Sequence, residues 1–266
     1  MVKCRTVMEA MERIAPKGLA EKWDNPGLLV GDLDQEVRKI LVCLDASDRI
    51  IEQAIDLGAD MIVSHHPLIF KPIKKIRTDL PLGRRLKLLL NHDIAVLAAH
   101  TNLDAAEGGV NDVLAKKIGL TEVEPFVLSS QDGETGMGRM GRLFSPLTIQ
   151  EISRQVRQAL PVSHVRVASA GSRIVRKVAL CGGSGAEFIG KAASLGVDAY
   201  VTGDVRYHEA QHGVEQGMHV IDAGHFGTEF PVVARLKARL EEELSKIKGA
   251  VEIVEDRSSE DIFAVL

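Results

Sequence analysis

The sequence predicts an α/β fold built from two similar lobes. Short apolar segments alternate with amphipathic ones, this alternation occurs twice, and the two occurrences match at a constant offset of 138 residues. Strands that alternate with helices are typical of a largely parallel sheet covered by helices. The chain has 266 residues, 45% of them hydrophobic, which is enough for a sizeable core in one large or two modest domains.

The elements of the first half follow from apolar periodicity and from turn residues. In chain order, we expect a helix at 6–15, a turn-rich loop at 21–32, a strand at 39–47, a helix at 48–60, a strand at 61–66, a helix at 81–93 and a strand at 94–100. The helix at 48–60 should end near Gly58, because glycine readily adopts the left-handed conformation that terminates many helices.

The second half repeats this plan. RKILVC at 38–43 resembles RKVALC at 176–181, and LGADMIVS at 57–64 resembles LGVDAYVT at 195–202. The alternative is that any two strand–helix units look alike. Since the match is ungapped across strand, helix and strand, we favour an internal repeat.

The repeat predicts the domain organisation. We expect a first lobe at 1–125 and a second lobe at 126–266. The Gly-rich, polar segment 129–142 is expected to be a linker or flexible loop near the joint.

Composition argues against several classes of function. The formal net charge of −4 gives no basic footprint, so no nucleic-acid partner is implied, and Lys74, Lys75 and Arg77 are interpreted as a solvated face. The N-terminus lacks the apolar core of a signal peptide, and no apolar run is long enough to span a membrane. Three distant cysteines without a CxxC favour reduced thiols in a cytoplasmic protein.

Metal-ligating residue types gather at the predicted strand ends, where active groups of open α/β sheets lie. One strand ends in two adjacent histidines, and a later strand of each lobe ends in His-x-x-x-carboxylate. A single histidine at a strand end is more often a hydrogen-bonded structural residue, but the pattern recurs in both lobes. The candidate residues are His65, His66, His100, Asp104, His225 and Glu229.

The adjacent histidines favour two ions over one. Neighbours on a strand point to opposite faces, and Pro67 keeps His66 extended, so the two imidazoles should be splayed. Imidazoles and carboxylates suit Zn, Fe, Mn, Co or Ni, and one carboxylate can bridge two ions roughly 3.5–4 Å apart. The sequence therefore predicts a dinuclear metal cleft between the lobes, holding two divalent ions.

Two further motifs leave alternatives open. HEAQH at 208–212 fits the H-E-x-x-H pattern of zinc proteases, but the glycines that follow predict a short helix. We instead expect His208 to face the metal pocket or the substrate. CGGSGAE at 181–187 is a turn that either offers N–H groups to an anion or is simply a tight glycine turn.

Seven motifs follow one another along nearly the whole chain: WDNPGLLVGD, SHHPLIF, AAHTNLD, GMGRMGRL, CGGSGAE, TGDVRYHEA and DAGHFGTE. With them the chain resembles the GTP cyclohydrolase I type 2 family, also called Nif-three-like dinuclear metal-centre proteins. The resemblance implies two α/β lobes, a two-metal site and a ring-shaped homohexamer. It also implies that His65 and His66 ligate separate ions, that Asp104 and His225 are further ligands, and that Glu229 bridges the ions.

The family name implies an activity, the hydrolysis of GTP to 7,8-dihydroneopterin triphosphate and formate. We accordingly expect a dinuclear metal-dependent hydrolase that acts on a small, nucleotide-like substrate, with His100 or His208 moving protons. The alternative is a non-enzymatic role as a metal-binding or regulatory hexameric scaffold.

Overall fold

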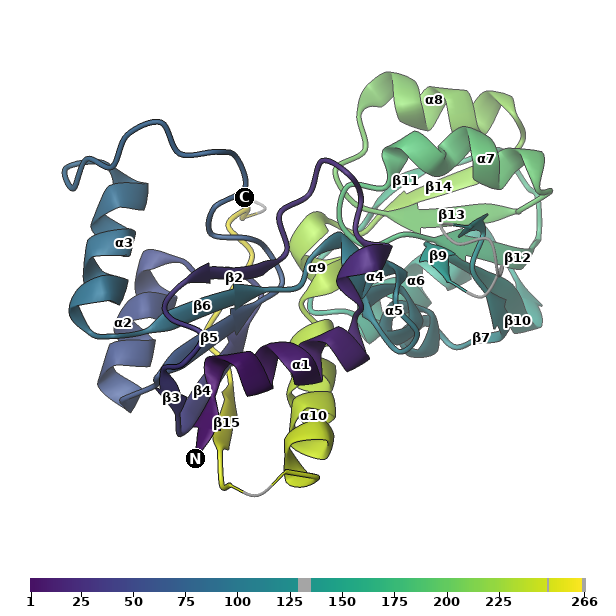
Figure 1. Ribbon diagram of the computed structural model, residues 1–266. Coiled ribbons are helices and arrows are strands. Elements are labelled where there is room, and N and C mark those ends of the chain that lie inside the picture. The colour runs from purple at the N-terminus through teal and green to yellow at the C-terminus, as the bar shows by residue number, and fades with distance from the viewer. Residues whose placement is uncertain (129–134, 248, 265–266) are drawn as a thin grey trace. The chain divides into compact units, whose positions relative to one another are not determined.

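The computed structural model describes residues 1–128, 135–247 and 249–264 of the chain (Figure 1). The chain divides into two compact units. The first unit comprises Met1–Leu103 and Val233–Ser259, and the second comprises Asp104–Val232 and Glu260–Leu266. Each contains a sheet with accompanying helices, so the predicted α/β class is confirmed.

A five-stranded sheet forms the centre of the first unit. Its strand order is β15-β4-β5-β6-β2, and all neighbours are parallel except β2 and β6. The elements are β1 (Val2–Lys3), α1 (Cys4–Ile14), a 3-10 turn (Lys17–Leu19), β2 (Gly27–Val30), β3 (Glu36–Val37), β4 (Lys39–Cys43), α2 (Asp48–Leu57), β5 (Met61–Ser64), α3 (Pro81–Asn91), β6 (Ala95–Ala98), α10 (Val232–Ser245) and β15 (Glu252–Glu255). Helix α4 (Thr101–Ala105) contains the point where the chain passes into the second unit.

Helices cover both faces of this sheet (Figure 1). Leu41 and Cys43 of β4 pack with α2 and α3 in one buried cluster. Helix α1 lies on the other face with α10 beside it, and Arg13 of α1 donates to Glu243 of α10 at 2.6 Å. Because side chains alternate along a strand, both faces of β4 are apolar, as is typical of a sheet covered on both sides.

Capping residues account for the bounds of α2. The side chain of Ser47 accepts from the N–H of Ile50 at 3.3 Å and so caps the first turn. Gly58 ends the helix with a φ of 62°, which confirms the predicted terminator.

The second unit contains a six-stranded sheet with the order β11-β14-β13-β12-β10-β7. Strands β12, β13 and β14 are parallel, and the outer pairs are antiparallel. The elements are α5 (Val110–Ile118), β7 (Leu120–Glu124), β8 (Val127–Leu128), β9 (Gly136–Met137), β10 (Arg139–Leu147), α6 (Ile149–Ala159), β11 (Arg166–Ala168), β12 (Val175–Leu180), a 3-10 turn (Ala186–Phe188), α7 (Ile189–Ser194), β13 (Ala199–Thr202), α8 (Tyr207–Glu215), β14 (His219–Asp222) and α9 (His225–Glu229).

Two separate apolar clusters lie against this sheet. Val178 and Leu180 of β12 pack with residues of α5 and α6. Ala179, between them in sequence, packs with Tyr200 and with residues of α7. The alternation of neighbouring residues between the two clusters shows that this sheet also has helices on both faces.

Corresponding hydrogen bonds occur in the two units at the offset of 138 residues. Oδ2 of Asp60 accepts from the N–H groups of residues 38 and 39 at 2.7 and 3.0 Å, and Oδ2 of Asp198 accepts from those of residues 176 and 177 at 2.9 Å. In both units the lysine of that pair also donates from Nζ to the carbonyl of a leucine, at 3.0 and 3.1 Å. These bonds correspond to the repeat that the sequence predicts.

The boundaries of the units bear on two predictions. The chain passes between the units after Leu103, Val232 and Ser259. The lobe boundary expected between residues 125 and 126 stays a prediction. Residues 129–134 of the expected linker lie outside the described residues. The rest of that segment forms β9 and the start of β10, because β10 pairs with both β7 and β12. Within the described ranges, no helix is both long and apolar enough to cross a bilayer.

Candidate metal centre

Three histidines of the first unit form an imidazole cluster beyond two neighbouring strands. His65 and His66 follow β5, and His100 follows β6. Since β5 and β6 are parallel, their carboxyl ends lie side by side. One nitrogen from each of the three rings lies within 4.8 Å of the other two, and the ring centroids are 4.9 to 5.6 Å apart. The rings of His65 and His66 are not splayed as expected, since their centroids are 4.9 Å apart. Both residues lie beyond the end of β5, where side chains need not alternate between the faces of the sheet.

The rings of His65 and His66 are fixed through Nδ1. Nδ1 of His65 lies 2.8 Å from the carbonyl oxygen of Ala99, and Nδ1 of His66 lies 2.9 Å from Oδ1 of Asp45. A carbonyl oxygen only accepts, so Nδ1 of His65 carries the proton and Nε2 keeps its lone pair. Metal-binding histidines are almost always oriented by this kind of bond at the other nitrogen.

His100 is held in the same way by Asp24. Nδ1 of His100 lies 2.8 Å from Oδ1 of Asp24, whose carboxylate is fully buried and also accepts from the N–H of Thr101 at 3.0 Å. Burial alone would raise the pKa of Asp24, but the hydrogen bonds from His100 and Thr101 outweigh it and lower the pKa to about 2. Asp24 is therefore ionised at neutral pH and orients Nε2 of His100 as an acceptor.

The second unit has its own pair of ligand residues. His225 and Glu229 are the first and last residues of α9, four positions apart, so their side chains lie on one face of the helix. Nε2 of His225 lies 3.0 Å from Oε2 of Glu229, and Nδ1 of His225 lies 2.8 Å from Oδ2 of Asp204. The sequence placed this pair at a strand end, whereas the structure places it on the helix after β14.

Asp104 lies close to Glu229 within the same unit. Both carboxylates are buried, and each offers an oxygen within 4.8 Å of the other. Burial raises the pKa of the Cys181 thiol, and the charges of Asp104 and Glu229 raise it further. The side chain of Asn111 donates to the carbonyl of Asp104 at 3.0 Å and accepts from the N–H of Gly182 at 2.9 Å. The side chain of Asn111 thus links the backbone at Asp104 to the glycine turn at Gly182, which lies beside Glu229.

Gly183 leaves space beside these ligands. Its φ is +64°, and a Cβ at this position would lie 2.1 Å from Oε1 of Glu229 and 3.2 Å from Nε2 of His225. A side chain would therefore fill the space into which these donor atoms point. An imidazole nitrogen and carboxylate oxygens around such a space are a suitable donor set for a divalent metal ion, so the residues present fit the predicted metal.

The three glycine N–H groups of the turn at 181–187 are already engaged within the protein. These groups donate to side-chain oxygens at 2.9 to 3.0 Å. The pairs are Gly182 with Asn111, Gly183 with Thr228, and Gly185 with Thr202. Of the two alternatives left open by the sequence, the structure favours the tight turn over the anion site.

His208 lies in the first turn of α8, within the second unit. Its side chain is exposed, and its Nδ1 lies 3.3 Å from the side-chain oxygen of Gln211. Glu209, the base of a zinc-protease motif, instead accepts from the N–H of Arg206 at 2.7 Å and caps the helix. In the part of the chain that the structure describes, neither His208 nor His212 belongs to a group of three metal-ligating donors.

The sequence interpretation missed two carboxylates and did not give a role to a third. Asp24, Asp45 and Asp204 each fix the Nδ1 of one histidine. A signal was available for Asp45, which follows β4 at the same sheet edge as the histidines after β5. Asp24 lies in a loop, and its distance from His100 along the chain gives no signal of their contact.

The chain is similar to several known proteins. Residues 2–261 match the family described as Duf34/NIF3 (NGG1p interacting factor 3). A Clostridium perfringens relative named GTP cyclohydrolase 1 type 2 homolog is 36% identical, covering 98% of this chain and 99% of its own. A solved Bacillus cereus protein related to NIF3 superposes with a TM-score of 0.93 at 28% identity, covering 100% of this chain and 99% of its own. Reduced HcgD from Methanocaldococcus jannaschii superposes with a TM-score of 0.81 at 31% identity, covering 96% and 97%.

Proposed function

Since this chain belongs to the Duf34/NIF3 family, we propose that it is a dinuclear metal-dependent hydrolase. The name of the curated relatives supports GTP as a substrate, which would react with water to give 7,8-dihydroneopterin triphosphate and formate. The observation that carries the proposal is the fixing of four imidazoles through Nδ1, with buried carboxylates among the neighbouring donors. Side chains that serve only packing do not need this uniform orientation.

The ligands in this proposal are those that the sequence motifs single out. The residues that would hold the two ions are His65, His66, Asp104, His225 and Glu229. Divalent ions bound there would polarise an electrophilic centre and lower the pKa of water towards neutrality. Zn, Fe, Mn, Co and Ni all accept this set of imidazole and carboxylate donors.

The chain's own residues would move the proton. Nε2 of His100 accepts a proton from the attacking water, and Asp24 stabilises the resulting imidazolium through Nδ1. His208 is the second candidate for proton transfer, and its exposed position suits the release of a proton to solvent.

Metal analysis tests the ligand assignment. Wild-type protein, loaded with Zn or Mn and desalted, should contain two ions per chain by elemental analysis. Glu229→Ala should lose metal, because it removes a buried carboxylate that would hold the ions. Glu215→Ala removes an exposed carboxylate of α8 and is the matched control, which should keep both ions. Equal metal content in the three proteins would refute the assignment.

Turnover tests the enzymatic part of the proposal. Metal-loaded protein is incubated with GTP, other nucleotides and phosphodiesters, while formate and inorganic phosphate are measured separately. Formate from GTP supports a cyclohydrolase, and phosphate release alone indicates a phosphatase. If no substrate turns over while bound metal exchanges readily, the non-enzymatic metal-binding scaffold replaces the hydrolase.

The assembly and the setting of the protein belong to the same proposal. The three cysteines are buried and form no disulfide, which supports a reducing cytoplasm. The ring-shaped homohexamer is tested by light scattering of the eluted protein, where a mass of one or two chains would rule it out.

A further inference from the structure

Exposed aromatic side chains adjoin the imidazole cluster of the first unit. Trp23 is 60% exposed and Phe70 is 43% exposed. Their ring centroids are 5.8 Å apart, and each lies 6.1 Å from the ring of His100. Large aromatic side chains are usually well buried, so two exposed rings in contact beside a candidate metal centre indicate a binding surface.

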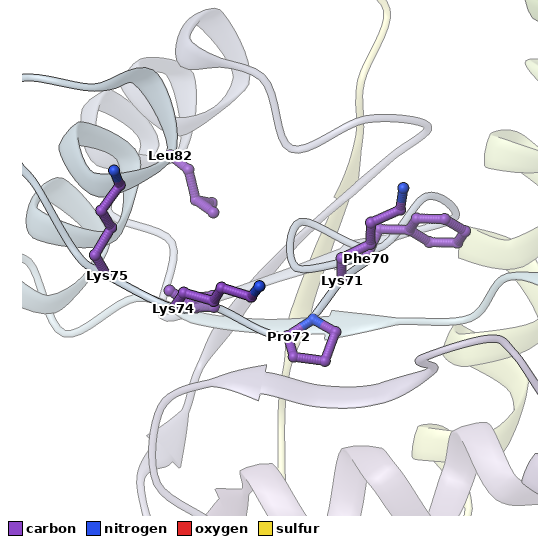
Figure 2. Close-up of a pocket in the computed structure, with 7 residues that line it drawn as sticks. Phe70, Lys71, Pro72, Lys74, Lys75 and Leu82 are labelled. Carbon is purple, nitrogen blue, oxygen red and sulfur yellow. The ribbon is translucent and has the colours of Figure 1, made fainter.

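A hollow lined by apolar side chains and three lysines begins at Phe70. The hollow measures about 500 Å³, and its lining includes Phe70, Lys71, Lys74 and Lys75. Figure 2 shows the ring of Phe70 at one end of the hollow and Lys75 with Leu82 at the other. Among the described residues, the three lysines have no ion-pair partner at 4 Å or less, whereas Arg77 in the same loop pairs with Asp79.

The two loops that carry these side chains are tied together. The side chain of Asn25 donates to the carbonyl of Ile69 at 2.6 Å, which joins the Trp23 loop to the Phe70 loop. Asp24, next to Trp23 in the chain, is fully buried and already bound to His100, and Asp79 in the lysine loop pairs with Arg77. The carboxylate of Asp24 therefore does not repel an anion that binds to the lysines of the hollow.

We propose that this surface binds the nucleoside triphosphate substrate, with the base on Trp23 and Phe70 and the phosphates on Lys71, Lys74 and Lys75. Any nucleobase can stack on an aromatic ring through its flat face, and the lysine ammonium groups act as point charges that attract phosphate oxygens. The chain as a whole is acidic, so a cluster of three lysines around one hollow has a specific electrostatic effect. This revises the interpretation of Lys74 and Lys75 as a merely solvated face.

The orientation has a chemical consequence, which rests on the proposed function. With the base against Trp23 and Phe70, it lies beside His100, while the phosphates extend along the loop away from the imidazoles. The reacting part of the substrate is then the base, as in the release of formate from a purine ring, and not the phosphate chain.

The single tryptophan makes the proposal directly measurable. Trp23 is the only tryptophan of the chain, so its fluorescence reports binding at this surface. Metal-free protein, prepared with a chelator and desalted, is titrated with GTP, guanosine and inorganic triphosphate. We expect saturable quenching by GTP, weaker binding with quenching by guanosine, and competition without quenching by triphosphate. The absence of metal keeps the test independent of hydrolysis.

Variants separate the two halves of the surface. Lys74→Ala/Lys75→Ala should raise the Kd for GTP at least ~tenfold and leave guanosine unchanged, because only the phosphates meet the lysines. Phe70→Ala should weaken both ligands. The matched control, Lys116→Ala/Lys117→Ala, removes two adjacent exposed lysines of α5 and should stay within about twofold of wild type.

Three outcomes would overturn the proposal. These are an absence of quenching by GTP, an equal loss of affinity in the two double-lysine variants, and tighter binding of a short single-stranded oligonucleotide than of GTP. The last would assign the surface to nucleic acid. Because no step needs metal, none of these outcomes depends on whether the protein is a hydrolase.

Discussion

Replacement of Gly183 by alanine should weaken metal binding while leaving the fold intact. The new Cβ would lie 2.1 Å from Oε1 of Glu229, whereas real Cβ contacts are essentially never shorter than 3.0 Å. The carboxylate oxygen must therefore move by about 0.9 Å, which is several times the ~0.2 Å tolerance of a metal–ligand distance. We expect metal affinity to fall by about 10- to 100-fold, the range seen when ligand orientation is lost.

Gly196→Ala is the control for backbone strain. Gly196 has a φ of +69°, close to the +64° of Gly183, but a Cβ there meets nothing within 4 Å. Both variants should lose roughly 1 kcal/mol of unfolding free energy, because both force alanine into the left-handed region. Since Oε1 is the end of a side chain that can turn away, the clash at Gly183 should add little to this loss.

The assay compares metal affinity with stability in the three proteins. Metal affinity is measured by competition with a chromophoric chelator, and stability by urea unfolding of the metal-free proteins. The predicted result is an equal loss of stability in the two variants and a loss of metal affinity in Gly183→Ala alone. Wild-type affinity in Gly183→Ala would refute the reasoning, since the space beside the donors would then not be where the ion binds.

Three further predictions follow from the groups around the site. Asp204→Ala should lower metal affinity by about 10- to 100-fold, because it removes the carboxylate that accepts from Nδ1 of His225 and orients the ring; an unchanged Kd in calorimetric titration would contradict this. Asp24→Asn should lower the free energy of unfolding by ~2 kcal/mol at pH 7, because the pKa of Asp24 falls from 3.8 to about 2 on folding. That stabilisation is complete above pH 3.8 and is lost as the pH falls through 2, so urea unfolding curves that fail to converge near pH 2 would contradict it. The three cysteines are buried, and burial raises the pKa of each thiol, so none should react with a chromogenic disulfide reagent until the protein is denatured.

Much of the fold was predictable because it depends on local patterns. The expected strands and helices of the first half are present, although the strands end two to four residues earlier than expected. The expected loop at 21–32 was wrong in part, because Gly27–Val30 forms β2 and pairs with β6. At the end of β5, the side chains of His65 and His66 turn to acceptors on Ala99 and Asp45 instead of continuing the alternation of the strand. Periodicity carries no information about such contacts.

The candidate site was predictable in its residue types but not in its supporting contacts. A histidine four residues before a carboxylate fits both a strand end and a helix turn, and only the packing after β14 decides for the helix at His225 and Glu229. The bond from His100 to Asp24 joins residues 76 positions apart. The space beside Gly183 likewise depends on where α9 approaches the glycine turn.

The order in which the chain is synthesised has a consequence for the first unit. Its edge strand β15 pairs with β4, joining Glu252 to Lys39, so this sheet lacks a strand until residues 252–255 have been made. The second unit needs mainly one continuous stretch, 104–232. We expect the second unit to acquire protease resistance first on the ribosome, because contacts between distant segments form late. Stalled chains ending near residue 232 would show resistance in both units if that order were wrong.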